Sequence, residues 1–207
     1  MTNPGICLVL SAPSGGGKTT LIREMLERFP RLRHSISYTT RIPRDDRSDA
    51  EDYHFIDEST FRKMIADGEF LEWAEVHGRL YGTSRNDLEA LLNDGYDVIM
   101  DIDIQGANQL MSHFADAVYV FILPPSIEIL EQRLRHRRSE SGASLARRLH
   151  NARREITRCT GYNYLVINDD LDTAVDQLRS ILIAEHMNMK RRSVQERAAQ
   201  FVRGMEQ

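Results

Sequence analysis

The sequence predicts an α/β fold in which a parallel sheet is covered by helices, and two observations predict it. The first is the alternation of short apolar runs with segments of helical periodicity, which is typical of parallel strands joined by crossover helices. The apolar runs occupy residues 6–10, 97–101, 117–123 and 164–167. The helical segments occupy residues 19–28, 105–113, 127–138, 145–157 and 171–186. The second is a glycine-rich connection between the first run and the first helical segment, a place where such sheets bind phosphate.

This connection has the composition of a phosphate-binding loop. Its glycines let backbone N–H groups turn toward an anion, and the helix that follows directs its positive end at the same point. Lys18 can reach the outer phosphates and the Thr19 hydroxyl can ligate Mg²⁺, so a nucleoside triphosphate is the expected ligand. A surface turn that ends in Lys-Thr by chance is disfavoured by the strand before it and the helix after it. The predicted triphosphate-binding residues are Ala12, Pro13, Ser14, Gly15, Gly16, Gly17, Lys18, Thr19 and Thr20.

One position departs from the usual pattern of this loop. Ala12 stands where the pattern has its first glycine, and a Cβ there disfavours a positive φ. A methyl group is tolerated if the residue keeps a β-region backbone.

The composition indicates one globular unit. With 207 residues and 41% hydrophobic content, the chain can bury a full core without disulfides or structural metal. A formal net charge of -4 excludes a generally basic nucleic-acid binder. Cys7 and Cys159 lie too far apart to suggest a disulfide framework or metal spacing. No apolar stretch is long enough to cross a bilayer. We therefore expect a soluble cytoplasmic protein without a nucleic-acid or membrane partner.

Two inserted segments interrupt the predicted core. Residues 35–92 read as short alternating strands with turns, which indicates a mixed lobe. Residues 126–158 contain nine arginines and four acidic residues, which suits a polyanionic ligand, although a solvated helix face remains an alternative. The expected core comprises 1–34, 93–125 and 159–207. Its last segment, 187–207, carries a weak apolar period that predicts a frayed helix or a helix that pairs two subunits.

Acidic residues follow the second core strand. Asp101 ends that apolar strand beside the phosphate loop, where it can hold Mg²⁺ through water together with Thr19. A helix-capping aspartate is the alternative. Asp103 lies two residues further on, and the two-residue period of a strand directs it to the same side as Asp101.

The lobe contains a second group of anion-binding side chains. Arg41 and Arg44 lie three residues apart across a proline, and Tyr53 follows within nine residues. Arginine forks match phosphate oxygens, so these residues predict a second anion pocket, with plain surface as the alternative. Glu72 lies in an otherwise apolar strand, which requires a partner if it is buried. A buried and a solvent-facing Glu72 both stay open at this point.

The motifs together resemble guanylate kinase in order and spacing. The resemblance runs from residue 6 to about residue 186. It rests on residues 12–20, 37–44, 52–53, 72–73, 81–83, 101–106, 133–137 and 168–170.

The resemblance implies an enzyme that transfers the γ-phosphoryl group of ATP to GMP with Mg²⁺. It implies Lys18, Arg44, Arg137 and Arg148 as catalytic residues, the last two from a lid formed by residues 126–158. It adds Arg133, Arg137 and Asn168 to the ATP-binding residues of the loop, and it gives Mg²⁺ to Thr19 and Asp101 through water. The implied GMP-binding residues are Ser37, Arg41, Arg44, Tyr53, Glu72, Tyr81, Thr83 and Asp103.

Within this set, the resemblance makes Glu72 and Asp103 acceptors for the N–H donors of guanine, and Ser37 and Thr83 donors to its acceptors. A kinase for a sugar phosphate would not need these four side chains. A scaffold domain that only binds peptides typically lacks the loop lysine and the lid arginines, which this chain keeps. The chain departs from the family in carrying Arg138 where glycine is common.

Overall fold

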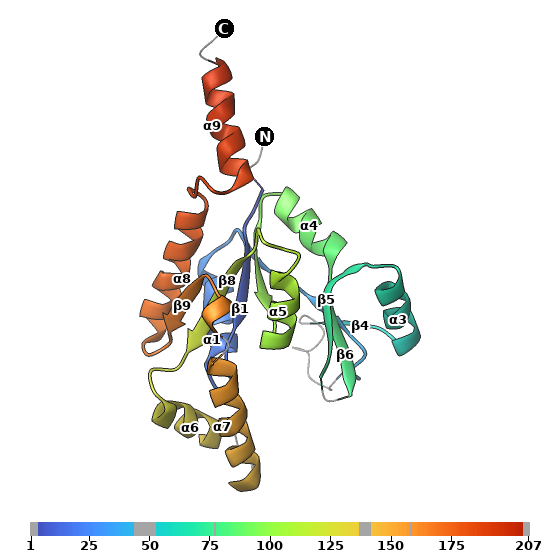
Figure 1. The fold of residues 1–207 in the computed structure, drawn as a ribbon, viewed down its shortest axis with the longest axis vertical. Coiled ribbons are helices and arrows are strands. Elements are labelled where there is room, and N and C mark those ends of the chain that lie inside the picture. The colour runs from blue at the N-terminus through green and yellow to red at the C-terminus, as the bar shows by residue number, and fades with distance from the viewer. Residues whose placement is uncertain (1–3, 44–52, 77, 137–141, 158, 205–207) are drawn as a thin grey trace.

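The computed structural model describes residues 4–43, 53–76, 78–136, 142–157 and 159–204. Its core is a five-stranded sheet in the order β2-β7-β1-β8-β9, and every neighbouring pair is parallel (Figure 1). The predicted fold class is thereby confirmed. The strands are β1 (Cys7–Ser11), β2 (Leu32–His34), β7 (Asp97–Asp101), β8 (Val118–Leu123) and β9 (Tyr164–Ile167).

The edge strand β2 was not among the predicted core strands. It has three residues, and only Leu32 is fully buried. Arg33 and His34 interrupt any apolar run, so hydrophobic periodicity carries no signal for this strand. Pairing with β7 defines it instead.

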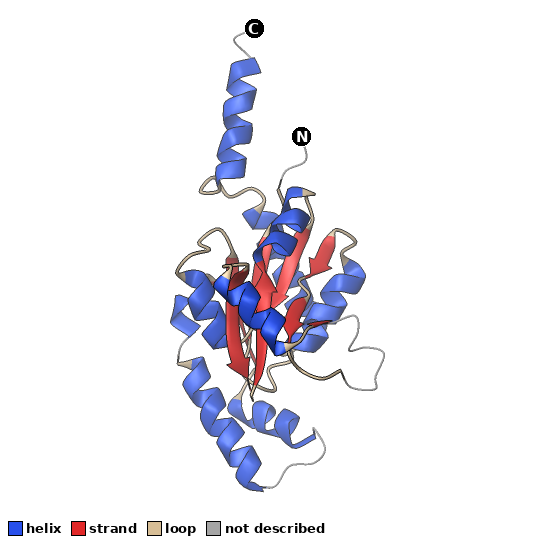
Figure 2. Ribbon diagram, turned by 90° about the vertical axis from the view of Figure 1, so that its right-hand side faces the viewer, coloured by secondary structure: helices blue, strands red, loops and turns tan. Residues whose placement is uncertain are grey.

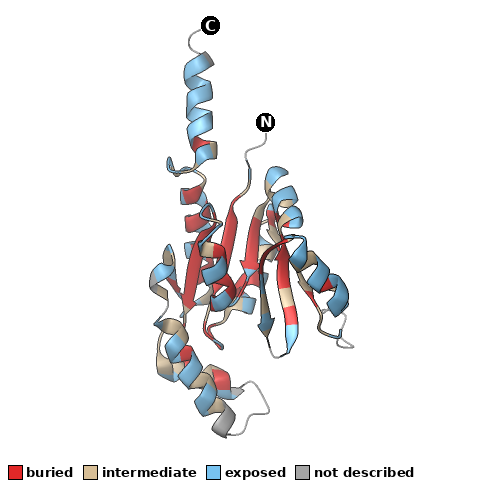
Figure 3. Cartoon of the chain, turned by 45° about the vertical axis from the view of Figure 1, so that its right-hand side comes forward, coloured by how far each residue is buried: buried red, intermediate tan, exposed pale blue. Residues whose placement is uncertain are grey.

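Helices cover both faces of the sheet. Successive side chains of a strand point to opposite faces, so one strand contributes to two buried clusters. Leu8 and Leu10 of β1 pack in one buried cluster, whereas Cys7 and Val9 pack in another. The first cluster is closed by α1 (Lys18–Arg28) and α8 (Leu171–Glu185), and the second by α4 (Arg85–Asn93) and α5 (Ile104–Met111). The buried strands therefore form the middle of three layers (Figure 3).

A second, mixed sheet lies beside the core, as expected for residues 35–92. Its order is β4-β3-β6-β5, with one parallel and two antiparallel pairs. Gly68 and Gly78 lie in turns of this segment and have positive φ values of 70° and 74°. Phe61 stacks on Phe70 to form a small core of its own. The elements are β3 (Ser37–Thr39), β4 (Tyr53–Phe55), α3 (Glu58–Ala66), β5 (Phe70–Val76) and β6 (Arg79–Ser84).

The helices α3 and α4 were not predicted within this segment. Each has only nine residues and a single fully buried side chain, Phe61 or Leu88. Capping side chains define their starts: Asp57 accepts from the Thr60 N–H, and Ser84 accepts from the Asp87 N–H.

The arginine-rich segment forms two packed helices, α6 (Ile127–His136) and α7 (Gly142–Ile156) (Figures 1 and 2). Leu130, Leu134 and Ala152 are buried between them. Gly142 is the first residue of α7.

The C-terminal segment contains α9 (Arg192–Gly204), which projects from the body of the molecule (Figures 1 and 2). The predicted helix is therefore present. Val194 is buried at its start, whereas Phe201 is 74% exposed. Among the residues that the structure describes, no helix is both long and apolar enough to span a membrane.

Candidate functional site

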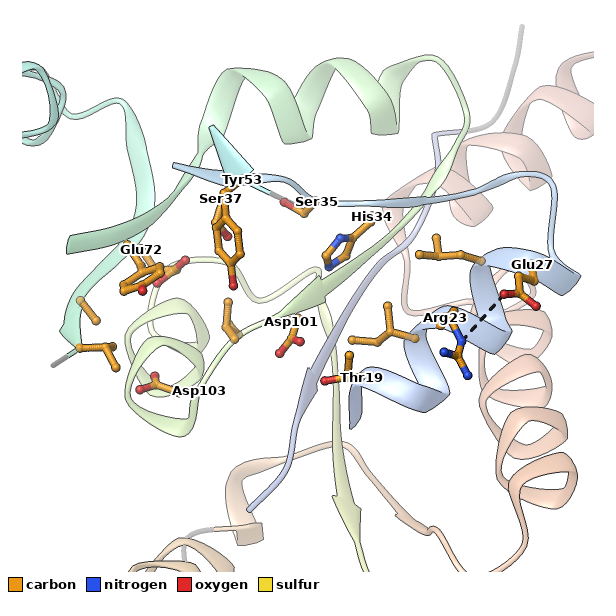
Figure 4. Close-up of a pocket in the computed structure, with 16 residues that line it drawn as sticks. Thr19, Arg23, Glu27, His34, Ser35, Ser37, Tyr53, Glu72, Asp101 and Asp103 are labelled. Carbon is orange, nitrogen blue, oxygen red and sulfur yellow. Dashed lines mark ion pairs between the residues drawn. The ribbon is translucent and has the colours of Figure 1, made fainter. Parts of the chain in front are cut away.

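A cavity of about 770 Å³ opens between the carboxyl end of the core sheet and the second sheet (Figure 4). Both sheets and helix α1 supply its lining. Side chains predicted from widely separated parts of the sequence meet there. The predicted site residues that line this cavity are Thr19, Ser37, Tyr53, Glu72, Tyr81, Asp101 and Asp103.

The phosphate loop joins β1 to the first residue of α1, Lys18. Gly15 and Gly17 have φ values of 89° and 90°, which L side chains rarely adopt. The departure at Ala12 is accommodated by Gly16, because a Cβ on Gly16 would lie 2.9 Å from the Ala12 methyl carbon. The loop therefore presents its backbone at a helix N-terminus, an arrangement that suits anionic phosphate.

Lys18 is held at the carboxyl end of the sheet. Its ammonium group contacts the Asp101 carboxylate and donates to the Ile102 carbonyl at 3.1 Å. The lysine thus lies beside both the loop and the acidic residue predicted to hold Mg²⁺.

The chemistry of Thr19 and Asp101 fits Mg²⁺. In the described part of the chain, no group of three or more His, Cys, Asp or Glu side chains could hold a metal ion. Mg²⁺ normally keeps several waters and binds through one or two protein oxygens together with substrate phosphates. A hydroxyl and a carboxylate on one cavity wall are therefore sufficient protein ligands.

Asn168 and Arg133 connect the loop to the last core strand and to α6. The Asn168 side-chain amide donates to the Gly16 carbonyl at 3.0 Å, and Arg133 Nη2 donates to the Asn168 carbonyl at 3.0 Å. Arg133 Nη1 is buried without a hydrogen-bond partner in the described structure. It lies 3.7 Å from the position of a Cβ on Gly17. A buried cationic donor without an acceptor beside this loop fits an anionic ligand.

Glu72 is buried, with 7% of its surface exposed. The pairing of β5 with β6 shifts register between Phe70 and Glu72, which marks a β-bulge at Leu71. Because the bulge breaks the alternation of the strand, Leu71 joins the core while Glu72 also points inward. Thr83 Oγ1 donates to Glu72 Oε1 at 2.8 Å. Of the two positions left open by the sequence, the structure has the buried one.

The pKa of Glu72 is raised from 4.5 to about 7. Burial is the main cause, and the negative charge of Asp103 adds to it, while the hydrogen bond from Thr83 acts in the opposite direction. A hydroxyl has one proton to donate. In this arrangement the Thr83 hydroxyl donates its proton to Glu72, so the donation to guanine implied by the resemblance would require this hydrogen bond to break.

Asp103 lines the same cavity as Asp101, but the reasoning from strand periodicity was wrong. Strand β7 ends at Asp101, and Asp103 is the N-cap of α5, where its Oδ1 accepts from the Gly106 N–H at 2.8 Å. The capping alternative that the sequence raised for Asp101 therefore applies to Asp103.

The predicted anion pocket in the lobe is partly described. The guanidinium carbon of Arg41 lies 5.1 Å from the centre of the Tyr53 ring, and the rings of Tyr53 and Tyr81 are 5.9 Å apart. Arg44 and Arg137 lie outside the described residues.

Helix α7 lies near the N-terminus of α5. Arg148 lies on α7. A smaller cavity of about 240 Å³ is lined by Asp103 and Gln105 on one side and by Asn151 and Arg154 of α7 on the other. The arginine-rich segment therefore faces the same end of the sheet as the phosphate loop.

Sequence reasoning missed several residues of the cavity. Ser35 follows β2 and lines the wall beside Ser37 (Figure 4). Apolar side chains Ile22 and Leu26 of α1 line it as well. Their helical spacing resembles that of core positions, so the sequence has no signal that separates them from the core.

Comparison with known proteins bears on this arrangement. The sequence matches the family described as Guanylate kinase over residues 5–185. It is 50% identical to "Guanylate kinase" of Syntrophotalea carbinolica over 185 residues, covering 89% of this chain and 88% of that protein. It is also 50% identical to "Guanylate kinase" of Geobacter sulfurreducens over 191 residues, covering 92% of this chain and 94% of that protein.

A solved structure agrees with these sequence relatives. The crystal structure of guanylate kinase from Anaplasma phagocytophilum superposes with a TM-score of 0.72 at 35% sequence identity. The match covers 91% of this chain and 89% of that one.

Proposed function

Because this chain belongs to the guanylate kinase family, whose members transfer the γ-phosphoryl group of ATP to GMP, we propose that the cavity beside Lys18 performs this transfer and releases ADP and GDP. One observation carries the proposal. Two carboxylates, Glu72 and Asp103, line the same cavity as Thr19 at the phosphate loop (Figure 4).

The two carboxylates recognise guanine. Its Watson–Crick edge carries N–H donors at N1 and N2, whereas adenine has an acceptor at N1 that would face a carboxylate lone pair. Glu72 and Asp103 accept from guanine, Ser37 donates to it, and Thr83 holds Glu72 in place. A site that hydrogen-bonds its substrate rejects a mismatched analogue by about 10⁴-fold, because buried polar groups are left unpaired.

The phosphate of GMP is bound at the lobe. Arg41 and Arg44 supply cationic forks, and Tyr53 and Tyr81 supply hydroxyls. The closeness of Arg41 to the Tyr53 ring supports this grouping. Since the second pKa of a phosphate monoester is about 6, bound GMP is already a nucleophilic dianion near neutral pH. The reaction then requires positioning and charge neutralisation rather than a strong general base.

ATP binds along the loop that contains Gly15, Gly16 and Gly17. Lys18 contacts its outer phosphates, and Arg133 turns its buried Nη1 toward them. Asn168 holds the loop through its hydrogen bond to the Gly16 carbonyl. The lid residues Arg137 and Arg148 stabilise charge on the transferred group, and loss of such an arginine typically costs about 10³-fold in rate.

Mg²⁺ bound near Thr19 and Asp101 would neutralise charge on the ATP phosphates. We infer that the core (1–34, 93–125, 159–207), lobe (35–92) and lid (126–158) close over both nucleotides, since closure excludes water as a competing acceptor.

We also infer a cytoplasmic enzyme, where ATP and GMP are its partners, and a homo-oligomer that forms through α9. The exposed Phe201 and Val202 of this helix support the second inference. An unchanged sedimentation mass after truncation beyond His186 would exclude pairing through α9.

A coupled ADP-release assay tests the proposed function. GMP, AMP, CMP and UMP serve as acceptors, first with Mg²⁺ and then with EDTA. With ATP as the donor, we expect turnover only when GMP is the acceptor and Mg²⁺ is present. Lys18→Ala should abolish it, whereas Glu72→Gln should raise the KM for GMP more than the KM for ATP. Equal turnover of AMP and GMP by the unmodified protein would contradict the proposal.

A further inference from the structure

Gly106 lies between the two carboxylates of the cavity. It is buried in the first turn of α5, and its N–H donates to Asp103 Oδ1 at 2.8 Å. A Cβ built on Gly106 would lie 2.9 Å from Glu72 Oε2, 3.6 Å from Glu72 Cδ and 3.5 Å from Asp103 Oδ1. Apart from its two chain neighbours and the backbone of its own helix, these are the three heavy atoms nearest to that position.

Nothing in the backbone requires glycine at this position. Gly106 is not among the glycines with positive φ in the described chain, so alanine could adopt the same conformation. Glycine also lowers the stability of a helix relative to alanine. Its absent side chain therefore has another consequence: the space of the missing methyl group admits the Glu72 carboxylate.

We propose that Gly106 is a positioning residue that sets the separation of the Glu72 and Asp103 carboxylates and thereby determines recognition of guanine. The inference rests on the proposed function, because it concerns the acceptors that this function assigns to the base. Through its N–H, Gly106 fixes one carboxylate, and through its missing side chain it makes room for the other.

Gly106→Ala should displace Glu72 and leave the fold intact. The atom in conflict, Glu72 Oε2, is at the end of a flexible side chain, so the carboxylate moves rather than the helix. Asp103 keeps its bond to the backbone N–H, and 3.5 Å to its Oδ1 is an ordinary contact distance. The displaced Glu72 then no longer meets the N–H donors of guanine.

Steady-state kinetics of Gly106→Ala test the inference. Hydrogen bonds to a charged group contribute enough that their loss should raise the KM for GMP by about 10- to 100-fold. The kcat, the KM for ATP and the melting temperature should stay near those of the unmodified protein. Gly161→Ala is the matched control, because a Cβ there meets only Met111 Sδ, at 3.5 Å.

A double-mutant cycle identifies Glu72 as the group through which Gly106 acts. Glu72→Asp shortens the side chain by one methylene and removes the conflict with a methyl group. Gly106→Ala should therefore raise the KM for GMP much less in the Glu72→Asp background, a non-additive result. Additive effects would overturn the inference, as would an unchanged KM for GMP in Gly106→Ala.

Failure here is distinguishable from failure of the proposed function. If the unmodified protein prefers GMP and Glu72→Gln weakens GMP selectively, while Gly106→Ala leaves that preference intact, then only the role of Gly106 is wrong. If the unmodified protein shows no preference for GMP, the proposed function itself is wrong.

Discussion

The affinity for GMP should depend on pH through Glu72. The carboxylate form accepts the N–H donors of guanine, whereas a protonated carboxyl group opposes one of them with its own proton. In the ligand-free protein the pKa of Glu72 is raised to about 7 by burial and by the nearby Asp103. GMP binding therefore favours loss of this proton, and affinity should rise as the pH increases through 7.

The size of the effect follows from the ionised fraction. With a pKa of about 7, roughly one-tenth of the Glu72 carboxyl groups are ionised at pH 6 and roughly nine-tenths at pH 8. The Kd for GMP should then fall about tenfold between these two values.

Isothermal titration calorimetry from pH 5.5 to 8.5 measures this change. The phosphate of GMP also ionises near pH 6, so the unmodified protein is compared with Glu72→Gln, which has no proton to lose at this position. The ratio of the two Kd values removes the contribution of the phosphate. A ratio that stays constant across the range would refute the reasoning.

Three further predictions concern stability and ATP. The melting temperature of the ligand-free protein, relative to Glu72→Gln, should fall from pH 5.5 to 8.5 in scanning fluorimetry. A carboxyl group whose pKa rises from 4.5 to about 7 on folding stabilises the fold at low pH, and this contribution is lost as the pH rises through 7. A constant difference contradicts this. Gly17→Ala should weaken ATP binding at least tenfold but leave GMP binding unchanged. The new Cβ would lie 2.2 Å from Asn168 Nδ2, and the φ of 90° is strained for alanine. An equal loss of affinity for both ligands in calorimetry would contradict this prediction. Leu130→Ala should cost the lid about 2–5 kcal/mol, since Leu130 is fully buried between α6 and α7; unchanged hydrogen exchange in both helices would exclude this.

The core of the fold could be predicted because its signals are local. Apolar runs mark β1, β7, β8 and β9, and the glycine-rich loop marks the start of α1 within one residue. Strand β2 has only one fully buried residue, so its place in the sheet depends on pairing with β7 rather than on its own composition.

The orientation of Glu72 could not be predicted, because a bulge determines it. Leu71 packs in the buried cluster that includes Ala107 and Leu110 of α5. The next residue, Glu72, approaches Gly106 of the same helix, whereas successive side chains of a regular strand point to opposite faces. No residue type near Leu71 predicts the bulge. The bulge arises from the register of β5 with Ser84 and Thr83 on the neighbouring strand.

The setting of Asp103 depended on where a strand ends. Its capping role arises because α5 begins at Ile104, one residue before the start that the apolar period indicates, so that Asp103 becomes the N-cap. The importance of Gly106 is longer in range still, because it follows from the approach of Glu72, a residue 34 positions earlier in the chain.

A crystal structure of the protein with GMP tests the central claim most directly, namely that Glu72 and Asp103 together read guanine. The account predicts that N1 and N2 of the base lie within hydrogen-bonding distance, about 3 Å, of these two carboxylates, with the phosphate near Arg41. A guanine ring bound elsewhere, away from both carboxylates, would contradict it.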